Sequence, residues 1–433
     1  MSQPLPRFKQ PKEMYLLALT EMCQRFAFWG VGNLLVLYLV QYQKFTDASA
    51  DKLFGIFTGI AFVLPVVGGY IADRLNYRLP VISGIILTSI GCFLIASGNL
   101  TMLYIALCFI AVGGSIFTPS IYALLGSLYR NQHHLRDSGF SIYYSAVNIG
   151  VFLAMILLGA IGQAHSWNMA FLIAGLIQLL GLIPFHKALK TFDVTHITPS
   201  HFTSAKQPSA PLHSYEKERI WVICILSFFS ILFWIAYNQG GSSMNLFALN
   251  FTNRSIGSFQ MPPSWLLSSE SLYLLILAFP LAKLYTHLAK KHKDPTPPMK
   301  SVISLVMMGL CFLVMVIGSS SLPKNATAGL ISPFYLLIAY AFMALGEMLI
   351  APIGLSLITH LSPHRFTAML VGVWYLCIGV AFYLGGIIAP WMSRVKEMSH
   401  FFSIFVVISF VFALLLLLLV KKLNKMRHLN HTS

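Results

Sequence analysis

The chain carries little charge for its length, and its charge is unbalanced. Only 10% of the 433 residues are charged, against roughly 25% in soluble domains. Acidic residues are rarer than basic ones, with 13 Asp and Glu against 29 Lys and Arg. Hydrophobic residues make up 57% of the chain. This composition excludes an ordinary soluble domain and favours a protein that crosses a membrane many times.

Cysteine is also scarce and unpatterned. All six cysteines fall inside apolar segments and none has Cys-x-x-Cys spacing, so we expect neither a metal site nor a disulfide framework. The sequence has no His-Glu-x-x-His motif, no Gly-rich phosphate loop followed by Lys and Ser or Thr, and no Gly-x-Ser-x-Gly elbow. These absences argue against an enzyme and an ATP-driven pump, and no cofactor is expected.

Long apolar runs are what the chain has in abundance. Runs of spanning length recur twelve times, within residues 14–42, 52–73, 79–98, 101–129, 138–164, 168–187, 219–248, 264–289, 299–319, 328–361, 366–392 and 399–420. Most basic residues outside these runs fall on the side of the N-terminus, which places both termini in the cytoplasm by the positive-inside rule. The net charge of +16 therefore reflects topology, and membrane lipid rather than nucleic acid is the expected partner.

A polar stretch divides the twelve expected helices into two sets of six. Residues 191–218 are rich in Ser, Pro and His without apolar periodicity, which predicts a cytoplasmic linker between a bundle in residues 1–190 and a bundle with a short cytoplasmic tail in residues 219–433. Ile149-Gly150-Val151 and Ile378-Gly379-Val380 stand at corresponding places in the halves. We expect halves related by a pseudo-twofold axis along the membrane normal.

Ionisable residues inside the apolar runs are few and indicate a transport pathway. Glu21 and Arg25 lie four residues apart in the first run, so they share a helical face and can pair. This pair either lines a polar cavity or only fixes helix packing. Arg25 would keep Glu21 ionised, whereas a carboxyl group in a poorly hydrated cavity can bind and release a proton near neutral pH. Glu270 and Glu347 are therefore the better candidates for a proton site.

Several segments resemble the motifs of one transporter family. Glu21-x-x-Gln24-Arg25-Phe26 with Gly30 is similar to the ExxERF…YYG motif in the first helix of proton-dependent oligopeptide transporters, a branch of the major facilitator superfamily. Gly68-Gly69-x-x-Ala72-Asp73-Arg74 resembles the loop between helices 2 and 3. Segments 117–150, 239–248 and 346–357 resemble the family's signatures in helices 4–5, 7 and 10. The resemblance implies an all-α membrane protein with the twelve-helix major facilitator fold.

The chain is an atypical member by this resemblance, because it departs from the family pattern at positions of charge. The departures are Gln24 for an acid, Phe28 and Trp29 for a tyrosine pair, Gly32 and Thr118 for two cations, and Glu270 for an asparagine. The pocket has thus lost two cations and gained an acid. Since a fixed cation recognises a carboxylate, their loss favours an amine-bearing or cationic solute over an ordinary zwitterionic dipeptide.

The resemblance also implies roles for individual residues. Proton coupling would rest on Glu21, Arg25, Glu347 and Glu270. The substrate would contact Phe28, Trp29, Thr118, Tyr144, Asn148, Trp234, Asn238, Glu270, Glu347 and Trp374. Gly69, Asp73 and Arg74 would form a structural motif. For Tyr144 and Asn148 the residues alone equally allow hydrogen bonds between helices.

The function implied is secondary active transport by alternating access. The expected reaction is proton-coupled symport of di- or tripeptides or related amino compounds, driven by the proton gradient, by a monomer in the cell membrane. Two alternatives stay open at this point. One is a carrier of a cationic or amine non-peptide solute, with or without proton coupling. The other is a sensor that binds its substrate without transporting it.

Overall fold

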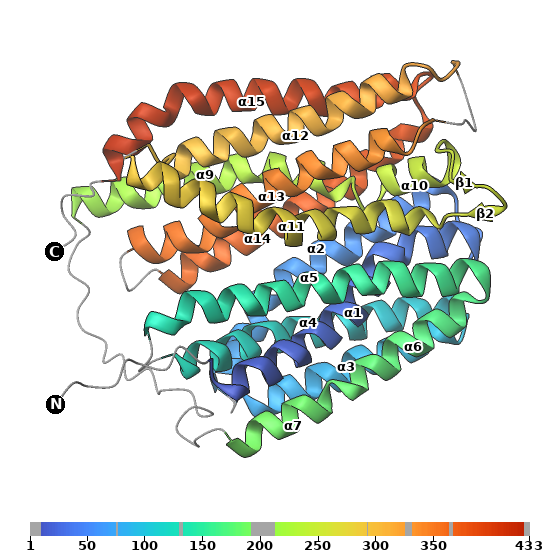
Figure 1. The fold of residues 1–433 in the computed structure, drawn as a ribbon, viewed down its shortest axis with the longest axis horizontal. Helices are drawn as coiled ribbons and strands as arrows, with labels where there is room; N and C mark the ends of the chain where they lie inside the picture. Colours follow the sequence, from blue (N-terminus) through green and yellow to red (C-terminus); the bar gives the residue numbers. More distant parts are fainter. Residues whose placement is uncertain are drawn as a thin grey trace. The chain divides into compact units, whose positions relative to one another are not determined.

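The computed structural model describes residues 10–74, 77–129, 133–191, 213–291, 293–324, 331–362 and 367–427. Helices make up nearly all of the described chain (Figure 1). In chain order the elements are α1 (Lys12–Gln41), α2 (Asp47–Arg74), α3 (Arg78–Ala96), α4 (Leu100–Leu128), α5 (His133–Ala164), α6 (Trp167–Leu180), α7 (Leu182–Thr191), α9 (Ser214–Asn238), α10 (Ser243–Asn250), β1 (Ser255–Ile256), β2 (Phe259–Gln260), α11 (Pro263–Lys290), α12 (Pro297–Ser319), α13 (Phe334–Leu361), α14 (Thr367–Ile388), the 3-10 helix η2 (Ala389–Ser393) and α15 (Met398–Met426). The strands β1 and β2 form one small antiparallel hairpin.

The structure confirms the twelve-span prediction: in the described ranges, twelve helical segments are long and apolar enough to cross a membrane. Two spans are interrupted. The sixth is α6 followed by α7, with a break at Gly181 just before Pro184, whose ring nitrogen offers no hydrogen for the helix ladder. The seventh is α9 followed by α10, separated by Gln239-Gly240-Gly241-Ser242, where two glycines weaken the helix.

The chain folds into two compact units, which are described separately. The first comprises residues 1–31 and 64–201, and the second comprises residues 32–63 and 202–433. The division passes through α1 and α2. Residues 32–63 therefore pack with the second unit, although they precede the polar stretch 191–218 in the sequence.

In the first unit, α3 packs against both α4 and α6, and α5 packs against α6 (Figure 1). A buried apolar cluster joins α1, α3, α4, α5 and α7 and includes Met14, Phe117 and Phe185. The helices α5 and α1 approach closely at Gly150, where a Cβ atom would lie 2.5 Å from the carbonyl oxygen of Met22. No side chain larger than hydrogen fits there without a shift of one helix.

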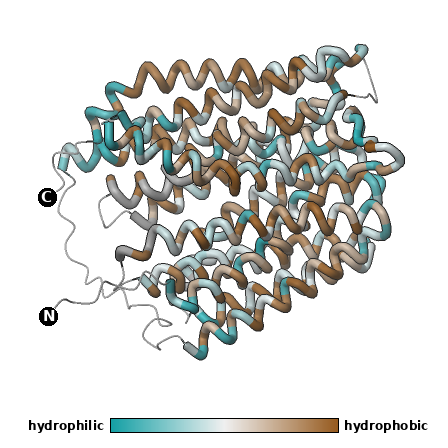
Figure 2. The backbone as a smooth tube through the Cα atoms, in the orientation of Figure 1, coloured by the Kyte–Doolittle hydropathy of each residue, from teal (hydrophilic) through white to brown (hydrophobic). Residues whose placement is uncertain are grey.

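In the second unit, α12 packs against α13 and α15, α9 against α14, and α11 against α13. Apolar residues cover most of α12 and α15, and hydrophilic residues gather at the C-terminal end of α15 (Figure 2). The helix α14 meets α2 almost backbone to backbone: a Cβ on Gly379 would lie 2.9 Å from the carbonyl oxygen of Gly59, and one on Gly386 would lie 2.4 Å from Cα of Gly55. Gly150 and Gly379, the corresponding glycines of the sequence repeat, thus each lie at a helix crossing.

Candidate functional site

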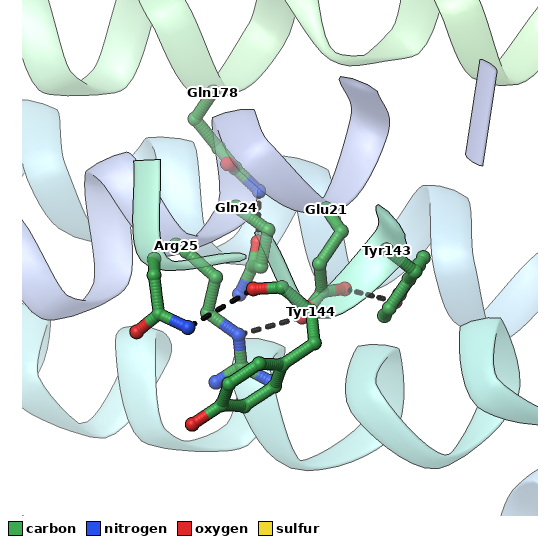
Figure 3. A network of polar contacts seen from close by, with 7 residues as sticks. Glu21, Gln24, Arg25, Tyr143, Tyr144 and Gln178 are labelled. Carbon is green, nitrogen blue, oxygen red and sulfur yellow. Dashed lines mark hydrogen bonds and ion pairs between the residues drawn. The ribbon is translucent and has the colours of Figure 1, made fainter. Parts of the chain in front are cut away.

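The first polar cluster lies in the first unit and centres on Glu21, whose side chain is fully buried. Arg25, one turn further along α1, donates from Nε to Oε1 of Glu21 at 2.6 Å. From α5, the hydroxyl of Tyr143 donates to Oε2 at 2.8 Å. Figure 3 shows the carboxylate between these two donors. Both oxygens of Glu21 are thus engaged, and the ion pair that the i,i+4 spacing predicts is formed.

A pair of amides extends this cluster toward α6. Nε2 of Gln178 donates to Oε1 of Gln24 (Figure 3). Among the described residues, Nε2 of Gln24 and Oε1 of Gln178 are buried without a hydrogen-bond partner. Gln24 stands where the resembling family carries an acid, so a neutral contact occupies that place. Sequence reasoning missed Gln178, although an amide in the middle of the apolar run 168–187 was a signal that could have found it.

The second polar cluster lies in the second unit and brings Glu270 and Glu347 together. Glu270 on α11 is 6% exposed, and Glu347 on α13 is partly buried. From α9, the phenolic oxygen of Tyr237 lies 2.9 Å from Oε1 of Glu270 and 3.1 Å from Oε2 of Glu347. One phenolic oxygen thus lies within hydrogen-bond distance of both carboxyl groups, which brings the two acids close to each other. No lysine, arginine or histidine in the described part of the chain forms an ion pair with either.

Aromatic rings surround Tyr237. The ring of Trp234 is 5.2 Å from that of Tyr237, and Phe382 of α14 stacks on Trp234 at 6.1 Å. Phe62 stacks on Phe382 at 4.6 Å. Nε1 of Trp234 is buried and has no hydrogen-bond partner among the described residues. A buried wall of this kind can hold an apolar side chain or an organic cation, and its indole N–H remains available to a polar group of a ligand.

The other expected substrate contacts differ in accessibility. Tyr144 is 40% exposed, and Trp29 and Thr118 are partly buried. Phe28 and Trp374 are buried, at 7% and 5% exposure. Thus Tyr144, Trp29 and Thr118 are the more exposed of these expected contacts.

Two asparagines expected to bind substrate also have protein partners, and their substrate role stays a prediction. Nδ2 of Asn148 donates to the carbonyl oxygen of Tyr144 in its own helix at 3.0 Å. Asn238 is 1% exposed, and its Nδ2 donates to Oγ1 of Thr58 at a long 3.4 Å. Its Oδ1 lies against Gly385 of α14. Asn238 therefore faces α2 and α14.

The expected structural motif is only partly described. Gly69 lies on α2, where an ideal Cβ would be in ordinary contact with Cβ of Pro119 at 3.7 Å. The side chains of Asp73 and Arg74 lie outside the described part of the structure, although their backbone completes α2. Their role stays a prediction.

Twelve candidate membrane spans with carboxyl groups set inside them are typical of an integral membrane protein with a polar pathway between its helices. The chain belongs to the POT family, whose model matches residues 78–210 and 207–408. This membership confirms the family resemblance and the twelve-helix fold, and places the protein in the cell membrane.

Curated relatives match along most of their length. The "Dipeptide and tripeptide permease B" of Salmonella typhimurium is 26% identical over 436 residues, covering 90% of this chain and 88% of the relative. The "Peptide transporter YePEPT" of Yersinia enterocolitica is 27% identical over 450 residues and covers 88% of both chains.

Solved structures share the fold over nearly the whole chain. A peptide transporter POT in complex with alafosfalin superposes with a TM-score of 0.87 at 23% identity, covering 98% of this chain and 97% of the other. A POT family transporter in complex with 5-aminolevulinic acid gives a TM-score of 0.86 at 19% identity, covering 96% and 97%.

Proposed function

We propose that the protein carries di- or tripeptides, or related amino compounds, together with protons by alternating access. The observation that carries this proposal is the contact of Tyr237 with both Glu270 and Glu347. Two carboxyl groups this close cannot both stay ionised without a cation. A proton or the amino group of a substrate supplies the missing positive charge, and exchange of one for the other would couple their movements. Relatives named as peptide permeases favour peptides over a non-peptide amine, and transport over sensing.

The proposal gives the two polar clusters different tasks. Glu347 and Glu270 form the proton site. Glu21 and Arg25 form an ion pair whose acceptors are already occupied, so it orients α1. In the first unit, substrate would contact Trp29, Thr118 and Tyr144, which are partly exposed, together with Phe28 and Asn148. In the second unit, it would contact the aromatic wall at Trp234 together with Asn238 and Trp374.

The proposed topology follows from the charge pattern of the sequence. Six-helix bundles in residues 1–190 and 219–433 are joined by a cytoplasmic linker in residues 191–218. Both termini lie in the cytoplasm because basic residues concentrate on that side. The functional unit is a monomer whose energy source is the proton gradient.

Transport in proteoliposomes tests the proposal. Proteoliposomes that contain the purified protein should accumulate a labelled dipeptide in their lumen when the external buffer is made acidic. A membrane potential that is negative inside should add to the driving force. Glu347→Gln should abolish accumulation but keep counterflow, which needs no net proton movement. Glu397→Gln is the matched control, since Glu397 forms its ion pairs outside the predicted spans. If wild-type transport depends on neither the pH gradient nor the potential, the protein is a passive facilitator and the proposed proton coupling is wrong.

A further inference from the structure

The hydroxyl of Tyr237 has more carboxyl neighbours than it has hydrogens. A phenol carries one hydrogen to donate and has lone pairs with which to accept. Its oxygen nevertheless lies 2.9 Å from Oε1 of Glu270 and 3.1 Å from Oε2 of Glu347. Tyr237 can donate to only one of them. The second contact is a hydrogen bond only if that carboxyl group is protonated and donates its hydrogen to the phenolic oxygen.

Packing fixes the position of this oxygen. The ring of Tyr237 stacks on Phe233 at 6.1 Å and contacts Trp234 at 5.2 Å and Phe382 at 6.3 Å. These rings come from α9 and from α14, which pack against each other. The hydroxyl is therefore held between α11 and α13 independently of the two acids.

In the described part of the chain, no cation forms an ion pair with either acid. Among the described residues, the titratable groups that interact with Glu270 or Glu347 are these two acids, Tyr237 and Tyr340. Tyr340 of α13 faces Glu270, and Cys311 of α12 faces Tyr340. No titratable side chain described on α2, α10, α14 or α15 interacts with either carboxyl group. Any charge or proton on the pair is therefore accommodated by the two acids and the one hydroxyl between them.

The two acids have different protonation states in the inference that follows, which rests on the proposed function. We propose that Tyr237 is a positioning residue that donates to ionised Glu270 and accepts from protonated Glu347. Both contacts are of hydrogen-bond length, so the hydroxyl can donate to one acid and accept from the other. Glu347 is the more accessible of the two acids, so its proton can exchange with water. Glu270 keeps the negative charge that meets the amino group of a substrate.

A transport experiment can test whether Glu270 and Glu347 have these different roles. Tyr237→Phe keeps the ring and removes only the hydroxyl. We expect proton-driven accumulation to fall about tenfold, the fold-change for losing one hydrogen bond to a charged group, with counterflow preserved and a shifted pH profile. Tyr129→Phe is the matched control, because its hydroxyl donates to Oε1 of Gln10 at 2.7 Å, away from both acids. It should leave coupling unchanged. Glu270→Gln should raise KM for a dipeptide more than Glu347→Gln does.

Infrared spectroscopy tests the proton's place without any transport. Wild-type protein should show the C=O stretch of one protonated carboxyl group near neutral pH, and this band should vanish in Glu347→Gln but persist in Glu270→Gln. Absence of the band, or its loss in Glu270→Gln alone, overturns the inference even if Tyr237→Phe fails to fold. Unchanged accumulation in Tyr237→Phe, or an equal loss of accumulation and counterflow, also overturns it. A wild-type protein without proton-driven accumulation instead refutes the proposed function, and the infrared result still decides the inference.

Discussion

The phenolic oxygen of Tyr143 lies 2.8 Å from Oε2 of Glu21, which ties α5 to α1 through a buried carboxylate. The contact completes the hydrogen bonding of Glu21, since Arg25 occupies the other oxygen. A charged acceptor inside an apolar bundle is costly to leave unsatisfied. The stability of the first unit should therefore depend on this tyrosine hydroxyl.

Tyr143→Phe should lower the free energy of unfolding by about 1.5–3 kcal/mol, the range for a hydrogen bond to a charged group. The matched control is Tyr129→Phe, which removes a bond to the neutral Oε1 of Gln10 at 2.7 Å and should cost about 0.5–1.5 kcal/mol. Thermal unfolding in detergent measures both. Equal losses in the two variants would contradict the charged character of the Glu21 contact.

Removing one partner of the Glu21–Arg25 pair should be more damaging than removing both charges. Glu21→Gln or Arg25→Gln leaves a buried charge alone, which costs about 3–5 kcal/mol. The double variant contains no unpaired charge, so its loss should be smaller than the sum of the two single losses. A double-mutant cycle followed by thermal unfolding measures the coupling. Additive losses would mean that the 2.6 Å contact contributes nothing.

Gly150→Ala should destabilise the contact of α5 with α1. Its new methyl group would lie 2.5 Å from the carbonyl oxygen of Met22, and overpacking of this kind costs about 1–3 kcal/mol. Gly126→Ala on α4 is the control, because nothing lies within 4 Å of its ideal Cβ. That variant should be neutral or gain about 0.5–1 kcal/mol from the helix preference of alanine. Similar behaviour of the two alanine variants would refute a close crossing at Gly150.

Glu397 should not contribute to the pH dependence of transport near neutral pH. A hydrogen bond from Lys324, whose Nζ lies 2.9 Å from Oε1, lowers the pKa of this partly exposed carboxyl group. A group with a lowered folded pKa contributes stability above its unfolded pKa of about 4.3 and loses it as the pH falls through the folded value. Glu397→Gln should therefore keep the wild-type pH profile of transport. A shifted profile would show that the outer ion pair takes part in coupling.

Hydropathy predicted the number of spans well because each span must be apolar over its own length, whatever its neighbours are. It did not predict the breaks at Gly181 and at Gln239–Ser242, which depend on single Pro and Gly residues within runs of unchanged hydropathy. Hydropathy also could not predict that residues 32–63 belong to the second unit, since this depends on which helices pack together.

The part of the candidate site that lies within a single helix could be predicted, because contacts inside one helix follow from sequence spacing. The spacing of Glu21 and Arg25 within one helix sufficed to predict their pairing. The partners that come from other helices could not be derived from spacing: Tyr143 on α5, Gln178 on α6 and Tyr237 on α9. The neighbours of Asn238, which are Thr58 on α2 and Gly385 on α14, likewise come from other helices and do not follow from spacing.

The cluster around Glu21 has an electrical consequence. Glu21 and Arg25 cancel each other, and Gln24 and Gln178 are neutral amides, so the four side chains carry zero net charge. Moving one elementary charge through a potential of 100 mV takes about 2.3 kcal/mol of work, whereas displacing a neutral group takes none. Motion of this cluster therefore generates no capacitive current. Any charge displaced as the protein cycles must be carried elsewhere, by the cargo, by its proton or by the acids of the second unit.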